Sequence, residues 1–145
     1  MTPLATSAGY SGTPLPQKLG LKDGQLVLFI DLPDQLAALA TAREFAAVQQ
    51  GKWGDLATAT GLDVVHAFTT SRATLDDNAA ALRRAIAPDG MVWISWPKRA
   101  SGIKTDMTED VIRELLLPTG LVDVKVAAID AIWSGLKLVI RRELR

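Results

Sequence analysis

The fold is decided by the stretch LDVVHAFTTSRATLDDNAAALRRAIAPDGMVWISW, residues 62–96. It opens with a continuous apolar run at residues 62–69, typical of a strand buried on both faces. Residues 71–87 then place apolar side chains at helical spacing, with charged residues off the stripe. A PDG turn at residues 88–90 leads into a second apolar run at residues 91–96. Strand, helix, turn and strand in this order predict a βαβ unit with a right-handed crossover.

The flanking segments extend this unit in both directions. Upstream, QLVLFID at residues 25–31 predicts another buried strand, and the Ala- and Leu-rich residues 34–50 predict one helix that stops at Gly51. Downstream, Thr108 can cap a helix reaching residue 117. Residues 122–126 and 136–142 alternate apolar and charged side chains, which favours a closing antiparallel pair of strands.

The chain therefore predicts an α/β fold with three layers: a Rossmann-like, mostly parallel sheet with a C-terminal antiparallel strand pair. At 145 residues, a single hydrophobic core is expected. Residues 1–24 are rich in Gly and Pro and lack periodicity, so we interpret them as an N-terminal arm packing on the domain. Residues 25–145 form the single α/β domain.

Composition excludes several functional classes. Sixteen basic residues balance sixteen acidic ones, so nucleic acid is not an expected partner unless a local patch binds it. The absence of cysteine excludes disulfides and thiolate chemistry, and a single histidine, His66, excludes a His-rich metal centre. No apolar run is long enough to span a bilayer, so we expect no membrane association and a cytoplasmic location.

Two resemblances follow from these residues. From residue 62 onward, the order of elements resembles the second half of a class I methyltransferase, and LRRAIAPDGMVWISW resembles that family's turn into its fifth strand. The whole chain is more specifically similar to a bacterial family, domain of unknown function 3052. That similarity is carried by SAGYSGTPLPQKLG, DVVHAFTTSRA, APDGMVWISWPKRASG, TDMTEDVIRE and GLVDVKVAAIDAIWSGLK. The resemblance implies a methyltransferase-like fold and brings no established activity.

The cofactor-binding half of that fold is expected to be shortened. Class I methyltransferases hold S-adenosylmethionine with a Gly-rich turn after strand one and an acidic residue at the end of strand two. Here strand one ends in FIDLPDQL, without glycine, and about thirty residues separate Asp31 from Leu62. That length accommodates one helix and at most a short strand, such as residues 56–60. We therefore expect no cofactor, S-adenosylmethionine included.

Ligands of open parallel sheets bind beyond the carboxyl ends of the strands. Cations and a helix N-terminus at these ends predict a binding site for a phosphate or carboxylate. The residues predicted to form it are Ser71, Arg72, Lys98, Arg99, Ser101 and Lys104. The cleft around it would be lined by Tyr10, Asp31, Asp34, Thr70 and Trp96. The alternative is that the charges are solvated, some of them paired with nearby aspartates.

Other candidates have simpler explanations. His66 lies in mid-strand, where an imidazole usually makes a core hydrogen bond. Asp31 and Asp34 could bind Mg²⁺, but helix capping explains Asp34 equally well. Trp96 either packs in the core or walls a pocket. No nucleophile elbow, dinucleotide fingerprint or P-loop is present, so no catalytic residue and no metal ligand is assigned.

Three functions remain open at this point. The first is a non-catalytic, methyltransferase-like module that binds an anionic small molecule or a protein partner. The second is a small enzyme, a degenerate or atypical methyltransferase, that uses the cleft at the strand ends. The third is a structural homo-oligomer or scaffold that pairs through an exposed sheet edge, near Leu56 or at the closing pair.

Overall fold

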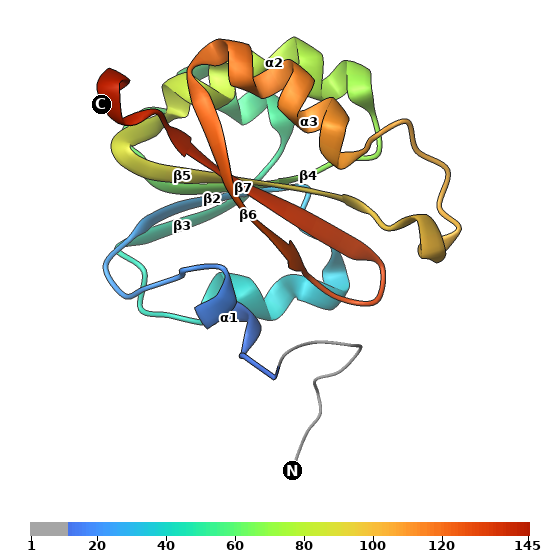
Figure 1. Cartoon of the computed structure of the whole chain (residues 1–145). Coiled ribbons are helices and arrows are strands. Elements are labelled where there is room, and N and C mark those ends of the chain that lie inside the picture. Colours follow the sequence, from blue (N-terminus) through green and yellow to red (C-terminus); the bar gives the residue numbers. More distant parts are fainter. Residues whose placement is uncertain (1–11) are drawn as a thin grey trace.

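The structure, a computed structural model, describes residues 12–145. Six strands form one sheet in the order β3-β2-β4-β5-β7-β6 (Figure 1). Four strands run parallel: β2 (Leu26–Ile30), β3 (Ala47–Gly51), β4 (Leu62–Phe68) and β5 (Ile86–Pro97). The sheet is completed by β6 (Leu121–Ala128) and β7 (Trp133–Ile140), which pair antiparallel. The predicted α/β fold with its antiparallel closing pair is confirmed.

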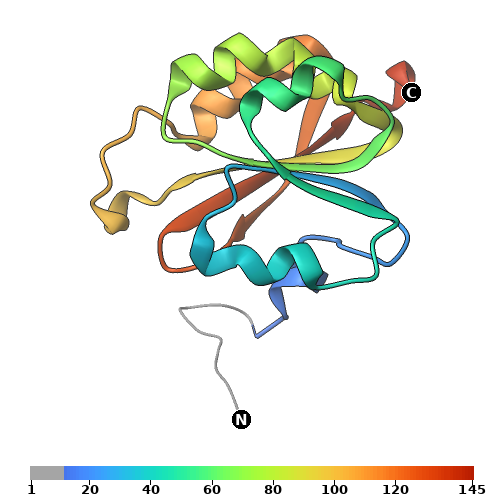
Figure 2. The same ribbon diagram turned by 180° about the vertical axis from the view of Figure 1, so that it is seen from behind.

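Helices cover both faces of the sheet (Figures 1 and 2). One face carries α2 (Arg72–Ala85), α3 (Glu109–Leu116) and the 3-10 helix η2 (Trp53–Thr58). The opposite face carries the short helix α1 (Leu15–Lys18) and the 3-10 helix η1 (Asp34–Thr41). Three further 3-10 turns are η3 (Arg99–Ser101), η4 (Leu117–Thr119) and η5 (Arg142–Leu144).

The core consists of two apolar clusters, one on each face of the sheet. Successive side chains of a strand point to opposite faces. In β4, Val65 therefore packs beneath α2 and α3, whereas Val64 and Phe68 pack toward α1 and η1. Because both faces are covered, the central strands carry continuous apolar runs, and this is why the sequence of residues 62–96 identifies them.

Residues 88–90, predicted as a turn before the strand, lie within the irregular start of β5, which requires a glycine at position 90. A Cβ atom at this position would lie 2.7 Å from the carbonyl oxygen of Leu62, where β4 begins. The PDG segment thus lets the irregular start of β5 approach the neighbouring strand closely.

Two sequence predictions between β2 and β4 are wrong. The expected helix over residues 34–50 ends at Thr41, and residues 47–51 form the edge strand β3 instead. The expected short strand at residues 56–60 lies largely within η2. The free edge of β2 needs partners for its backbone N–H and C=O groups, and β3 supplies them in register from Leu26 opposite Ala47 to Ile30 opposite Gly51.

The segment before β2 packs against the sheet. Leu19 and Leu21 follow α1 and are buried in the cluster on that face. The indole N–H of Trp93 in β5 donates to the carbonyl oxygen of Leu19 over 3.0 Å. Tyr10, predicted to line the cleft, lies outside the described residues.

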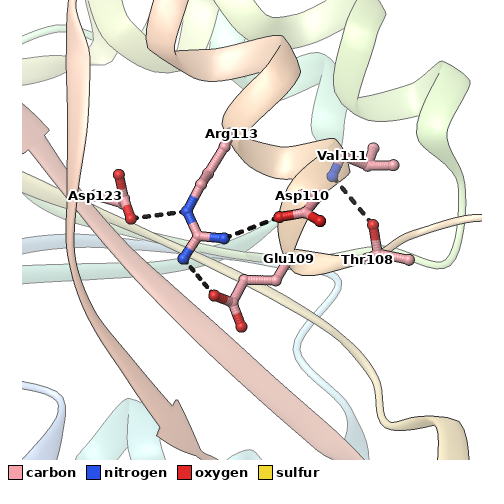
Figure 3. A network of polar contacts seen from close by, with 6 residues as sticks. All are labelled: Thr108, Glu109, Asp110, Val111, Arg113 and Asp123. Atoms are coloured by element: carbon pink, nitrogen blue, oxygen red, sulfur yellow. Dashed lines mark hydrogen bonds and ion pairs between the residues drawn. The ribbon is translucent and has the colours of Figure 1, made fainter.

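Helix α3 is fixed at its N-terminus and tied to β6 by one arginine (Figure 3). The hydroxyl of Thr108 accepts a hydrogen bond from the backbone N–H of Val111 over 3.1 Å. Arg113 pairs with Asp110 at 3.2 Å and with Glu109, both in the first turn of α3. Its Nε also donates to Asp123 of β6 over 2.9 Å. No helix of residues 12–145 is both long and apolar enough to span a membrane.

Candidate functional site

A pocket of about 300 Å³ opens where the neighbouring parallel strands β2 and β4 end. We call it the strand-end pocket. It is lined by Asp31, Trp53, Phe68, Thr69, Thr70, Ser71, Thr74 and Trp133. Two larger cavities, of about 330 and 490 Å³, lie at the β2–β3 edge and between α1 and η1, away from the carboxyl ends of the central strands. Ligands of parallel sheets bind at those ends, so the strand-end pocket is the candidate site.

One wall of the pocket is aromatic and rigidly supported. The ring of Phe68 stacks on the imidazole of His66 at 4.4 Å and meets Trp133 edge-on at 5.3 Å. Nε2 of His66 lies 2.7 Å from the hydroxyl oxygen of Ser95, and both side chains are buried. Burial lowers the pKa of His66 to about 3, so the imidazole is neutral at physiological pH. It acts as a core support for Phe68.

Hydroxyl groups between the end of β4 and the start of α2 also line the pocket. The backbone N–H of Ser71 donates to the hydroxyl of Thr69 over 3.0 Å. The Ser71 hydroxyl caps α2 by accepting from the N–H of Thr74 over 3.2 Å. The hydroxyl of Thr105 donates to the carbonyl oxygen of Thr70 over 2.6 Å, which ties the loop after β5 to these lining residues.

Asp31 is the charged residue of the pocket. Its φ of 54° places it in the left-handed region, the only non-glycine residue of the described chain with a positive φ. Aspartate tolerates this conformation better than most residues, and such conformations are concentrated at binding and active sites. Its backbone N–H donates to the carbonyl oxygen of Gly51 over 3.1 Å. Its carboxylate lies 3.4 Å from the ammonium group of Lys52, and both side chains are exposed.

The structure does not gather the predicted cations into one rim. The N–H of Arg72, at the start of α2, donates to Asp106 over 2.7 Å. Its guanidinium binds Glu114, and this hydrogen bond raises the pKa of Arg72 and lowers that of Glu114. The charge of Lys98 acts instead on Lys18, the last residue of α1 on the other face of the sheet.

The remaining predicted residues are placed as follows. Arg99 and Ser101 belong to η3, and the hydroxyl of Ser101 donates to the carbonyl oxygen of Lys98 over 2.7 Å. Trp96 is buried in the core cluster beneath α2 and α3. Asp34 starts η1, and Lys104 follows η3. The predicted residues that meet in the strand-end pocket are Asp31, Thr70 and Ser71.

Sequence reasoning missed the aromatic part of the pocket. Phe68 and Trp133 lie at strand ends, where an apolar run looks the same whether its last side chain faces the core or a cleft. The available signal was position, because Phe68 lies just before Thr70 and Ser71, which were predicted to lie at the strand end. Trp53, at the start of η2, completes the aromatic part of the lining.

No family model matches the chain, and no curated protein matches its sequence. Solved structures do share its fold. A SAM-dependent methyltransferase from Aquifex aeolicus matches with a TM-score of 0.61 and 14% identity, covering 86% of each chain. A TehB-like SAM-dependent methyltransferase from Corynebacterium glutamicum matches at 0.53 and 12%, covering 88% of this chain and 85% of that one. Magnesium protoporphyrin IX methyltransferase from Synechocystis, solved with bound SAM, matches at 0.54 and 11%, covering 81% and 71%.

These structures correct the expectation that the chain has no cofactor. That expectation rested on length, namely too few residues before β4 to hold S-adenosylmethionine. The Aquifex methyltransferase is matched over equal shares of both chains, so a protein of nearly this length belongs to a SAM-dependent class. The Synechocystis enzyme contains SAM in one structure and SAH in another. The inference from missing length to missing cofactor is therefore wrong, and the chain has the mixed α/β fold of the class I methyltransferases.

Proposed function

We propose that this chain binds S-adenosylmethionine in the strand-end pocket and uses it for methyl transfer. The observation that carries the proposal is the position of the pocket between the ends of β2 and β4, with one carboxylate and three aromatic rings in its lining. The fold that the chain shares with SAM-dependent methyltransferases supports this proposal.

The lining fits the chemistry of this cofactor. S-adenosylmethionine carries a sulfonium and an ammonium cation, and Asp31 supplies a carboxylate at the pocket edge. The faces of Trp53, Phe68 and Trp133 suit an adenine ring or a cation. When bound, the cofactor supplies an electrophilic methyl group. The pocket departs from the familiar pattern because β3 ends in Gly51, followed by Lys52 rather than a carboxylate.

Calorimetric titration with S-adenosylmethionine tests the proposal. Asp31→Asn removes the charge and keeps a side chain that tolerates a positive φ. Losing a charge-assisted hydrogen bond worth about 1.5–3 kcal/mol weakens affinity roughly ten- to 150-fold. Asp34→Asn is the matched control, since Asp34 lies in η1 outside the pocket lining, and it is expected to bind as the wild type does. Absence of binding by the wild type at millimolar cofactor refutes the proposal.

A second candidate is a module of the same fold that binds without catalysis. It is favoured by the lining, in which Asp31 is the one ionisable side chain, so no second group stands ready to accept a proton from a methyl acceptor. An anion at the start of α2 is less favoured as the bound molecule, because Asp106 and Glu114 already engage Arg72 there. Cofactor binding without transfer of a labelled methyl group to any acceptor tested supports this candidate.

A further inference from the structure

Strand β3 is one of the two outer strands of the sheet, and its residues 47–50 are exposed. The backbone N–H and C=O groups of successive residues in a strand point alternately to its two sides. The carbonyl oxygen of Gly51 accepts from the backbone N–H of Asp31 over 3.1 Å, so residues 47, 49 and 51 bond toward β2. Val48 and Gln50 therefore direct their N–H and C=O groups away from the sheet, where a further strand could pair with them.

The other outer strand, β6, has two features that obstruct such pairing. Its register with β7 shifts between Asp123 and Lys125, and irregularities of this kind turn an edge away from an incoming strand. Asp123 and Lys125 also place charges on β6 itself, which natural proteins use to protect an edge. In contrast, β3 pairs with β2 without a register shift, and its sequence AVQQG contains neither a charged residue nor a proline. Of the two edges, β3 is the one suited to pairing.

Apolar surface accompanies the unpaired backbone groups at this edge. Val48 is 42% exposed, and Leu26, which stands opposite Ala47 at the start of β2, is 38% exposed. Both residues line the cavity of about 330 Å³ at the β2–β3 edge. A strand added to a sheet covers backbone groups through hydrogen bonds and apolar side chains through contacts with its own side chains. The β3 edge therefore offers both kinds of contact to a partner strand.

The charges at the two ends of β3 suit a second copy of this chain as that partner. Glu44 precedes the strand and is exposed, whereas Lys52 follows it with a side chain that is 84% exposed. The ammonium group of Lys52 lies 3.4 Å from one carboxylate, that of Asp31, and has three N–H donors. Arg43, the cation next to Glu44, donates to backbone carbonyl oxygens of its own chain. Antiparallel pairing of β3 with its own copy brings the acidic end of each strand beside the basic end of the other.

We propose that two copies of this chain associate through β3, with the strands antiparallel and Val48 on the two-fold axis, so that one continuous sheet crosses the dimer. In a two-fold dimer the same surface of each copy meets itself. Val48 then lies opposite Val48 of the second copy, and the two residues exchange backbone hydrogen bonds. In the same register Gln50 lies opposite Ala46, and Glu44 comes beside Lys52. Pairs of β-branched side chains and of opposite charges are favourable across antiparallel strands.

The dimer leaves both strand-end pockets open. The parallel strands of the two copies run in opposite directions in the merged sheet, so their carboxyl ends, and the pockets beyond them, lie at opposite edges of it. The interface consists of backbone and side chains of β3 and its flanking residues, and it does not depend on the function proposed above.

Analytical ultracentrifugation of the wild type and of two lysine variants tests the interface. From about 1 μM to 1 mM protein, the wild type should show a reversible equilibrium between monomer and dimer. Val48→Lys places like charges opposite each other at the axis and should raise the dissociation constant of the dimer at least about tenfold. Val126→Lys is the matched control, because Val126 is a valine of β6 that is 49% exposed. It should change the constant less than about twofold.

The absence of cysteine from the sequence allows a second test that does not require the lysine variant to fold. Residues of a hydrogen-bonded antiparallel pair have Cα atoms about 5.5 Å apart, a distance that a disulfide spans. Mild oxidation of Val48→Cys should therefore link most of the protein into covalent dimers at concentrations at which the wild type is dimeric. Val126→Cys, the control on β6, should stay largely monomeric under the same conditions.

Three results would overturn the proposal. The first is a wild type that stays monomeric up to about 1 mM, which would leave β3 free for a strand of a different protein. The second is an equal effect of the two lysine substitutions on the dissociation constant. The third is equal cross-linking of the two cysteine variants. None of these measurements involves S-adenosylmethionine, so their outcome is separate from that of the cofactor titration.

Discussion

His66 lies in β4 and is buried. Its imidazole is hydrogen-bonded to the hydroxyl of Ser95 and stacks on the ring of Phe68. Burial lowers its pKa from 6.5 to about 3. Below pH 6.5 the imidazole is protonated in the unfolded chain but stays neutral in the folded chain. The contribution of His66 to the free energy of unfolding is therefore fully present above pH 6.5. This contribution falls by about 1.4 kcal/mol per pH unit as the pH drops from 6.5 toward 3. Urea unfolding at pH 7, 5 and 4 should show this loss. His66→Gln should lower stability at pH 7 but flatten the pH slope, and an unchanged slope contradicts the assignment.

At the scale of elements, Arg113 joins α3 to β6. Three carboxylates surround its half-buried guanidinium, and its hydrogen bond to Asp123 lowers the pKa of that carboxyl. Arg113→Met keeps the aliphatic stem and should reduce the free energy of unfolding by about 1–2 kcal/mol, less at high salt. Arg84→Met, at an exposed position on α2, should stay within about 0.5 kcal/mol. The measurement is unfolding in urea, because guanidinium chloride is itself a salt and would screen the ion pairs. Equal losses of stability in the two variants would contradict the role of Arg113 in joining α3 to β6.

Some strands of the sheet were predicted from the sequence, and one was not. The central strands β2, β4 and β5 were predicted because burial on both faces leaves a continuous apolar run. Strand β3 was not, since AVQQG exposes most of its surface and follows an Ala-rich stretch whose helix propensity is a weak guide. Its strand conformation comes from pairing with β2, which no local pattern reveals. Likewise, Asp31, Thr70 and Ser71 were predicted from strand-end position, whereas the site's aromatic rings resembled core residues.

For the whole molecule, the segment before β2 belongs to the core. Leu19 is 1% exposed and packs with residues of β2, β4 and β5. Leu19→Ala should cost about 2–5 kcal/mol of folding free energy. Gln17→Ala, at an exposed position in α1, should cost less than about 0.5 kcal/mol. Thermal and urea unfolding measure both. A cost below 1 kcal/mol for Leu19→Ala would mean that this segment is a detachable arm, contrary to its packing.

The distribution of tryptophan gives the molecule a built-in optical reporter. Trp53 and Trp133 border the strand-end pocket, whereas Trp93 and Trp96 are buried beneath helices on opposite faces. Emission from the first pair should respond to an arriving nucleoside while the second pair contributes a constant background. A titration with S-adenosylmethionine is expected to quench part of the signal, and Trp133→Phe should remove much of the change. Occupancy of the site can thus be followed in unlabelled protein, in the same cuvette in which its unfolding is measured.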